Sequence, residues 1–278
     1  MATPQGWEDR NRQQFDALAG GYDRLGFLAR VAAFVADRVG ARPGQAALDV
    51  MTGTGGVALA LTGQVGAGQM GAGQGGAGGS VVGLDLSAGM VEVARRRVPG
   101  AQFVVGDAAH LPFPDGSFDV VVCASGLFFV PDMGAALREW RRVVRPGGSV
   151  VFSSFGRGLL GDLPGLWRAR LESHGVTPGF PPLGRIPTPE AARDLLLGAG
   201  LRDVQVDRTD LPYTLACVGD RWDEIAAGLE GQPLAGFAPS VRAQIAAQHC
   251  GQDLAPLFLR GPLTVPLPVI VARGTRPE

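Results

Sequence analysis

The chain has 278 residues, a formal net charge of -1 and 46% hydrophobic residues, which is enough for one large α/β domain or two small ones. Every basic side chain is an arginine, so mechanisms that need a lysine Schiff base, a phosphate-loop lysine or a serine–lysine pair are excluded. The nearly neutral charge gives no global attraction to nucleic acid or to anionic membranes.

The three cysteines and three histidines are scattered along the chain. They form neither a C-x-x-C pair nor an H-E-x-x-H motif, and we therefore expect no disulfide framework and no metal site. No charged-then-apolar leader opens the sequence, and no apolar run reaches 18 residues. These features predict a cytoplasmic protein without a membrane span.

Hydrophobic periodicity predicts helices up to about residue 42, where Phe15, Leu18 and Ala19 recur at helical spacing. Short apolar runs then alternate with helical stretches, which is typical of a parallel sheet with crossover helices. Expected strands are residues 46–50, 81–84, 103–105, 120–123 and 150–152, and expected helices are 56–61, 88–98 and 133–144. Ser87 is a suitable N-cap for the second of these helices, and residues 145–148, Arg-Pro-Gly-Gly, predict a turn before the fifth strand.

The C-terminal third predicts a helix at 191–198, after Thr188-Pro189-Glu190, and strands at 204–208 and 269–273. Pro266 and Pro268 suit the start of the last strand better than its centre, because proline cannot donate a ladder hydrogen bond. Residues 63–79 are rich in Gly, Ala and Gln. Such a segment cannot bury enough apolar surface to offset its chain entropy, so we interpret it as a flexible insertion.

The most informative segment is LDVMTGTGG at residues 48–56, where the first strand turns into a helix. Small residues there let backbone N–H groups approach a ligand at a helix N-terminus. Alone the segment is weak, because Gly53, Gly55 and Ala58 also satisfy the loose G-x-G-x-x-G/A dinucleotide pattern.

Four further segments strengthen this interpretation. Residues 82–90, VGLDLSAGM, place the carboxylate of Asp85 at the tip of the second strand, where it can accept hydrogen bonds from ribose hydroxyls. GDAAHLPF follows the third strand at residues 106–113, DGSFD leads into the fourth at 115–119, and RPGG precedes the fifth.

In this order, the five segments resemble the class I S-adenosylmethionine-dependent methyltransferases, in particular the ubiquinone/menaquinone-biosynthesis-like (methyltransferase type 11) family. The resemblance covers residues 49–155 closely, the stretch from Phe15 to Asp23 loosely, and the C-terminal third only in its order of elements. It implies an α/β, Rossmann-like, doubly wound seven-stranded sheet with N-terminal helices and C-terminal lid insertions. We expect one domain, with a helical cap at 1–45, a cofactor-binding core at 46–156 and substrate-covering insertions and last strands at 157–278.

The resemblance also implies S-adenosylmethionine as cofactor and assigns roles to individual residues. Gly53 and Gly55 would wrap the methionine part, and Asp49 would order that loop or reach the amino group. Asp85 would hold the ribose. The remaining implied cofactor contacts are Leu86, Met90, Asp107, Ala108, Ser125 and Tyr22.

This chain departs from the family pattern at two places. Met51 replaces the first glycine of the loop, and Phe128-Phe129 stand where relatives often carry His or Asn. A histidine base at that position is therefore unsupported, and the sequence names no catalytic residue. We expect Phe128 and Phe129 to form an apolar acceptor pocket, closed by Trp167, Phe180 and Trp222.

The expected activity is methyl transfer to a small, hydrophobic molecule. Two alternatives stay open. One is a catalytically silent methyltransferase-like binding module. The other is an NAD(P)-dependent oxidoreductase, although this chain lacks the catalytic Tyr-x-x-x-Lys motif because it has no lysine. A nucleic-acid methyltransferase would usually carry D/N-P-P-Y/F after the fourth strand, where this chain has Ala-Ser-Gly-Leu at 124–127. We therefore expect a small-molecule acceptor and no nucleic acid, and the oligomeric state stays unknown.

Overall fold

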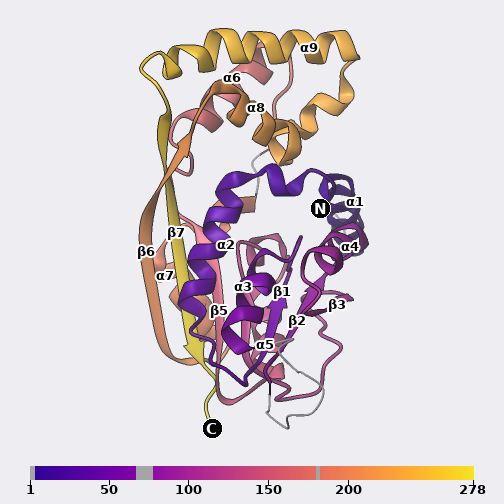
Figure 1. The fold of residues 1–278 in the computed structure, drawn as a ribbon, viewed down its shortest axis with the longest axis vertical. Coiled ribbons are helices and arrows are strands. Elements are labelled where there is room, and N and C mark those ends of the chain that lie inside the picture. Colours follow the sequence, from indigo (N-terminus) through magenta and orange to yellow (C-terminus); the bar gives the residue numbers. More distant parts are fainter. Residues whose placement is uncertain (1–3, 67–77, 180–181) are drawn as a thin grey trace.

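The computed structural model describes residues 4–66, 78–179 and 182–278, and Figure 1 shows how their helices and strands are arranged. The strands are β1 (Ala46–Val50), β2 (Ser80–Asp85), β3 (Gln102–Val105), β4 (Phe118–Cys123), β5 (Val144–Phe155), β6 (Arg202–Leu215) and β7 (Leu263–Thr275). Within the described ranges they form a seven-stranded sheet in the order β3-β2-β1-β4-β5-β7-β6. Strand β7 runs antiparallel to both β5 and β6, and the other pairs are parallel.

The helices are α1 (Pro4–Leu18), α2 (Gly26–Val39), α3 (Gly56–Val65), α4 (Ala88–Arg97), α5 (Met133–Val143), α6 (Leu163–Ser173), α7 (Pro189–Gly198), α8 (Val218–Ala227) and α9 (Pro239–Gln248). Short helical turns are η1 (Tyr22–Arg24), η2 (Leu127–Phe129), η3 (Pro182–Arg185), η4 (Leu229–Gly236), η5 (His249–Leu254) and η6 (Ala255–Phe258).

The strand order reverses between β1 and β4, which pair directly with each other. Because β–α–β crossovers are right-handed, the helices that follow β1 and β2 cover one face of the sheet, and α5 covers the other. A crevice forms beyond the carboxyl ends of the strands at such a switch point. The expected Rossmann-like α/β fold is therefore confirmed, and its geometry locates the place where a ligand would bind.

Local sequence features explain where the helices begin. Ser87 Oγ accepts a hydrogen bond from the amide of Met90 at 3.0 Å at the start of α4, as predicted for an N-cap. Thr188 Oγ1 accepts from the amide of Ala191 at 3.2 Å and caps α7 in the same way. Strand β1 is buried from Ala47 to Val50, as expected for a central parallel strand with helices on both faces.

Three sequence expectations need correction. Residues 145–148 lie within β5 rather than in a turn before it, although Gly147 has φ +75° and the β4–β5 register shifts between Phe118 and Val120. Residues 63–65 belong to α3, because the helical run continues past the first glycine, and residues 67–77 of the expected insertion lie outside the described residues.

Pro266 and Pro268 lie inside β7 and not at its start. Their carbonyl groups accept hydrogen bonds from the amides of Leu160 and Gly156, at 2.9 and 2.7 Å. At these two positions, one edge of β7 therefore faces residues 156–160, beyond the end of β5, and this is the edge on which proline has no amide hydrogen. Strand β6 pairs with the opposite edge. Proline is tolerated there because no ladder hydrogen bond to β5 is required.

Helices α6, α8 and α9, with turns η4, η5 and η6, form a C-terminal helical group at one end of the molecule (Figure 1). The long strands β6 and β7 connect this group to the rest of the sheet. Its apolar centre contains Trp167, Leu171, Ile225, Leu234 and Ile245 and is distinct from the main core around the sheet.

Candidate functional site

A cleft lies at the carboxyl ends of the strands, with about 820 Å³ of empty space when the adjoining open solvent is included. Its walls come from α1, η1, the loop after β1, the end of β2 with the start of α4, and the loops after β3 and β4. The lining residues are Trp7, Glu8, Asn11, Arg12, Phe15, Tyr22, Met51, Gly53, Asp85, Leu86, Ser87, Met90, Gly106, Asp107, Ala108, Ala109, Ala124, Ser125, Gly126, Phe129, Val130 and Pro131. Eight of the ten expected cofactor contacts are in this set, and Asp49 and Gly55 are the two outside it.

Asp49 holds the glycine loop, residues 51–55 between β1 and α3. Its side chain does not line the cleft. Its Oδ2 accepts hydrogen bonds from Thr52 Oγ1 at 2.6 Å and from the amide of Ala58 at 3.0 Å. Burial raises the pKa of this carboxyl group to about 7, although both hydrogen bonds lower it. Of the two roles that the resemblance implied for Asp49, the geometry matches the ordering of the loop.

Gly53 and Gly55 have different surroundings. Gly53 lines the cleft with φ +55°. A Cβ atom on Gly55, which has φ +81°, would lie 3.2 Å from Val98 Cγ2 and 3.3 Å from Ala94 Cβ. Gly55 therefore lets the loop turn and pack closely against the end of α4, and it does not face the cleft.

Asp85 is the carboxylate at the tip of β2 that lines the cleft. Its Oδ2 accepts from the amide of Gly53 at 2.8 Å, and Oδ1 accepts from the amide of Ser87 at 3.0 Å. Burial raises the pKa of Asp85, against the lowering effect of these amides. The side chain thus connects the first two strand-end loops and keeps a polar group at the cleft wall.

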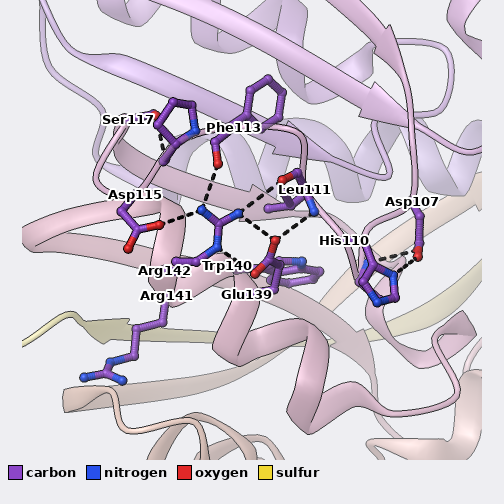
Figure 2. A network of polar contacts seen from close by, with 12 residues as sticks. Asp107, His110, Leu111, Phe113, Asp115, Ser117, Glu139, Trp140, Arg141 and Arg142 are labelled. Atoms are coloured by element: carbon purple, nitrogen blue, oxygen red, sulfur yellow. Dashed lines mark hydrogen bonds and ion pairs between the residues drawn. The ribbon is translucent and has the colours of Figure 1, made fainter.

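Asp107 lies after β3 and lines the cleft with Ala108. Its Oδ1 accepts from the amide of Ala109 at 2.9 Å, and Oδ2 lies 2.6 Å from Nδ1 of His110 (Figure 2). The His110 side chain is 84% exposed, and the adjacent carboxylate raises its pKa. This exposed ring is a partner of Asp107 at the rim of the cleft.

Helix α5 holds the loop after β3 in place (Figure 2). Trp140 Nε1 donates to the carbonyl oxygen of Ala108 at 2.8 Å, and Glu139 Oε1 accepts from the amide of Leu111 at 2.9 Å. Arg142 donates to the carbonyl oxygen of Phe113 at 2.8 Å and to Glu139 Oε1 at 2.7 Å. The cleft wall at Asp107 and Ala108 is therefore built on a fixed support.

Ser125 lies after β4 in the left-handed region, with φ +56°. Its amide donates to Ser153 Oγ at 2.9 Å, which holds this unusual backbone conformation. Such strain in a non-glycine residue often accompanies functional sites. A Cβ atom on the next residue, Gly126, would lie 2.9 Å from Met51 Cβ. The large Met51 side chain in the glycine loop is therefore accommodated by a glycine at position 126.

The side of the cleft formed by α1 was not anticipated residue by residue. Trp7, Asn11 and Phe15 are spaced four residues apart and share one face of the helix, and all three line the cleft. Asp16 anchors the helix because its Oδ1 accepts from Ser87 Oγ at 2.5 Å and from the amide of Gly89 at 3.0 Å. The spacing of the three residues was visible in the sequence, but their orientation toward the strand ends was not.

Tyr22, on η1, joins this wall, and its ring packs 6.3 Å from that of Phe15 at an angle of 72°. Phe129 lines the cleft and meets Phe15 edge-on, with ring centroids 5.1 Å apart. An apolar, aromatic region thus adjoins the polar groups of Asp85 and Asp107.

The expected acceptor pocket needs correction. Phe128 is fully buried, and its ring centroid lies 6.3 Å from that of Phe155, in the core rather than in the cleft. Trp167 and Trp222 pack against each other at 5.9 Å in the C-terminal helical group and do not line the cleft. Phe180 lies outside the described residues. Turn η2 directs only one of the two adjacent phenylalanines into the cleft, and the two tryptophans pack against each other away from it.

None of the three histidines is among the residues that line the cleft. His174 Nε2 lies 2.8 Å from Gln248 Oε1, and His249 is buried beside Trp167 with Nδ1 2.8 Å from Asp253 Oδ2. In the part of the chain that the structure describes, no group of three or more His, Cys, Asp or Glu side chains could hold a metal ion. No described helix is both long and apolar enough to cross a membrane.

Comparison with known proteins matches residues 48–152 to the family model of the methyltransferase domain. This segment contains the glycine loop, Asp85, Asp107 and Ser125, so the family resemblance inferred from the five sequence segments is confirmed.

Among curated proteins, the methyltransferase domain is similar to demethylmenaquinone methyltransferases. That of Renibacterium salmoninarum is 38% identical over 159 residues, 55% of this chain and 62% of the relative. That of Beutenbergia cavernae is 41% identical over 140 residues, 50% of this chain and 51% of the relative. The chain therefore spans less than two thirds of the length of these relatives.

Solved structures share the fold at low identity. The YcgJ protein from Bacillus subtilis is 19% identical with a TM-score of 0.53, and the match covers 90% of this chain and 99% of that one. Phosphoethanolamine N-methyltransferase 2 from Haemonchus contortus, solved with phosphomonomethylethanolamine and S-adenosylhomocysteine, is 17% identical with a TM-score of 0.56. That match covers 100% of this chain and 61% of the other.

Proposed function

We propose that this protein is an S-adenosylmethionine-dependent methyltransferase that acts on a small, apolar, quinone-like acceptor. The observation that carries the proposal is one cleft lined by Gly53, Asp85, Asp107 and Ser125, at the switch point of a methyltransferase domain. The curated relatives are named for a quinone substrate. We also propose that the whole chain works as one domain, with α1 and the C-terminal helical group serving the same site.

The polar part of the cleft fits an adenosyl sulfonium cofactor. Asp85 would accept hydrogen bonds from the ribose hydroxyls, as a strand-tip carboxylate does in other nucleoside sites. Leu86, Met90 and Ala108 offer apolar contacts to the adenine, and Asp107 offers its carboxylate to the adenine edge. The acidic side chains that face the cleft also suit a cofactor that carries positive charge.

The apolar part of the cleft fits the acceptor. Phe15 and Phe129 meet edge-on, and Trp7 lines the same cleft; aromatic side chains of this kind bind planar apolar rings well. S-adenosylmethionine, when bound, would supply an electrophilic methyl group: the bond to the acceptor nucleophile would form as the C–S bond breaks, and S-adenosylhomocysteine would be the second product. The acceptor hydrogen that is replaced leaves as a proton to water.

The side chains of this chain would contribute orientation and exclusion of water. No histidine lines the cleft, so the structure favours an acceptor that ionises without a histidine base. Placement of two reactants in line can contribute about 7–11 kcal/mol toward the barrier, which makes this mechanism sufficient in principle.

Two measurements test the proposal. Titration calorimetry should show binding of S-adenosylhomocysteine, and incubation with S-adenosylmethionine and a reduced, short-chain demethylmenaquinone should release S-adenosylhomocysteine and yield a product heavier by one methyl substitution. Phosphoethanolamine serves as the polar acceptor for comparison. Tighter binding of NAD than of S-adenosylhomocysteine would contradict the methyltransferase assignment, and turnover of phosphoethanolamine alone would contradict the acceptor class.

A further inference from the structure

The turn η1 occupies a position between the cleft and the C-terminal helical group. It carries Tyr22 into the cleft, and its next residue, Asp23, binds the glycine loop. Asp23 Oδ1 accepts from Thr54 Oγ1 at 2.6 Å and lies 2.8 Å from Nη1 of Arg97 on α4. On this side, the turn is tied to the elements that surround the cofactor position.

On its other side, η1 leads into α2, whose first turn contacts a buried carboxylate of α8. Glu224 is 2% exposed, and its Oε1 accepts from the amide of Phe27 at 3.4 Å and from the hydroxyl of Tyr213 at 2.6 Å. Phe27 is the second residue of α2, so its amide has no partner within the helix. The N-cap position, Leu25, supplies no side-chain hydrogen bond, and a carboxylate at this end of a helix is stabilising.

The packing at this contact leaves no space. A Cβ atom on Gly26 would lie 2.4 Å from the hydroxyl oxygen of Tyr213, and one on Gly228 would lie 2.9 Å from Leu25 Cδ2. The C-terminal helical group therefore touches the start of α2 directly, and a shift of one requires a shift of the other.

Charge accompanies this close packing. Arg221 is 0% exposed; its Nη1 lies 3.6 Å from Glu224 Oε2, and its Nη2 donates to Glu230 Oε2 at 2.6 Å. Buried ion pairs add little stability compared with apolar side chains of similar size, but they can specify one arrangement over others. Glu224 is the member of this network that also meets α2, so the network can specify how α8 sits on α2.

We propose that Glu224 is a positioning residue that couples the C-terminal helical group to Tyr22 through the start of α2 and η1. Seating of the group on α2 and binding of the cofactor then favour each other. This inference rests on the proposed function, because it concerns the cofactor cleft. Coupling between two binding events or conformations is reciprocal in free energy, so it has two measurable consequences.

The experiment uses three single variants of the full chain, and Tyr213→Phe is also combined with Tyr22→Ala. Tyr213→Phe removes the hydroxyl that holds Glu224, and Glu224→Gln removes its charge. Thr214→Val is the matched control, because it deletes a hydroxyl on the next residue of β6 that lies 3.0 Å from Thr264 Oγ1, across on β7. Each variant is measured for its affinity for S-adenosylhomocysteine and for hydrogen exchange in residues 218–236, with and without that ligand.

In the wild type, S-adenosylhomocysteine should slow exchange in residues 218–236. Tyr213→Phe and Glu224→Gln should each weaken its binding by about 5- to 10-fold and lose most of that protection, whereas Thr214→Val should change neither. In a Tyr22→Ala background, Tyr213→Phe should add less than about twofold, because the coupling passes through Tyr22. A purely structural role would instead reduce the affinity equally in both backgrounds.

Wild-type affinity in Tyr213→Phe, together with unchanged ligand protection of residues 218–236, would overturn the coupling. If Glu224→Gln does not fold, Tyr213→Phe alone decides the question, since it leaves the Arg221–Glu224 pair in place. Failure of the wild type to bind S-adenosylhomocysteine would overturn the proposed function and this inference together. That outcome is distinct because it is read from the wild type.

Discussion

The carboxylate of Asp85 accepts a hydrogen bond from the backbone amide of Gly53 at 2.8 Å, so the end of β2 holds the loop that follows β1. The side chain that would bind the ribose is thus the same one that shapes the glycine loop. A substitution there should affect binding both directly and through the loop.

Asp85→Ala should weaken the binding of S-adenosylmethionine and of S-adenosylhomocysteine by roughly 10- to 150-fold, the equivalent of about 1.5–3 kcal/mol for a lost hydrogen bond to a charged group. Titration calorimetry measures both constants. Glu92→Ala is the control, because this α4 side chain is 71% exposed and pairs with Arg96 one turn away. Unchanged affinity in Asp85→Ala would contradict the placement of the ribose.

The two adjacent phenylalanines should separate into two phenotypes. Phe129→Ala should raise the KM for the acceptor while it leaves the Kd for S-adenosylhomocysteine nearly unchanged, because Phe129 lines the apolar part of the cleft. Phe128→Ala should instead lower the free energy of unfolding by about 3–5 kcal/mol, since it removes a fully buried ring. Denaturant unfolding and initial-rate kinetics of both variants provide the comparison, and a reversed pattern would contradict these two roles.

Replacement of each histidine by Gln should reduce kcat by less than about tenfold, or about 1.4 kcal/mol, because none of the three lines the cleft. A general base typically contributes 10²- to 10⁴-fold, and its loss is readily detected. Steady-state kinetics at saturating acceptor decides the matter. A thousandfold loss of kcat in any one variant that still binds both ligands would refute a mechanism without a histidine base.

Asp49 should make stability depend on pH. Burial raises its pKa from 3.8 to about 7, so between these values the folded chain keeps a proton that the unfolded chain has released. The free energy of unfolding should therefore fall as pH rises across this window, by on the order of 4 kcal/mol from this group. Asp49→Asn cannot titrate and should gain in Tm relative to the wild type from pH 5 to pH 8. A constant difference in Tm across that range would contradict the raised pKa, and exposed Asp115→Asn is the control.

Residues 67–77 should be replaceable by Ser-Gly at little cost. The carbonyl oxygen of Val65 accepts from the amide of Gly79 at 3.1 Å, so the two ends of this segment already meet and a short connection can join them. Closure entropy changes by only about 0.6 kcal/mol for each doubling of length. Thermal melting and S-adenosylhomocysteine titration should both match the wild type, and a large fall in Tm would give these residues a structural role.

Much of the sheet could be predicted from local sequence. Strand β1 occupies the expected residues 46–50, because a short apolar run between turn signals has few alternatives in a parallel sheet. Strands β6 and β7 are much longer than expected. Most of β6 is partly or fully exposed, and an edge strand of this kind carries too little apolar periodicity for its full extent to be recognised.

The residues of the cleft likewise include some that could be predicted from the sequence and others that could not. Asp85 ends β2, and Asp107 and Ser125 each lie two residues beyond the last residue of a strand, so the order of strands was sufficient to bring them together. Trp7 and Asn11 reach the cleft through the path of α1 across the molecule, which depends on long-range packing and on the anchor at Asp16. Gly55 faces α4 rather than the cleft because of the exact path of a loop, a feature that a glycine pattern does not encode.

The prolines of β7 have a consequence for how the molecule meets other copies of itself. Strand β7 continues past the end of β5, and such a strand edge can pair with a strand from another chain. Along this edge, Pro266 and Pro268 have no amide hydrogen to offer, and their carbonyl groups are already bound by Leu160 and Gly156. Within the described segments 156–160 and 266–268, an incoming strand would find neither donors nor free acceptors at these two prolines. Replacement of both prolines by threonine would add two amide donors to this edge, whereas the carbonyl groups would still be bound by residues 156 and 160.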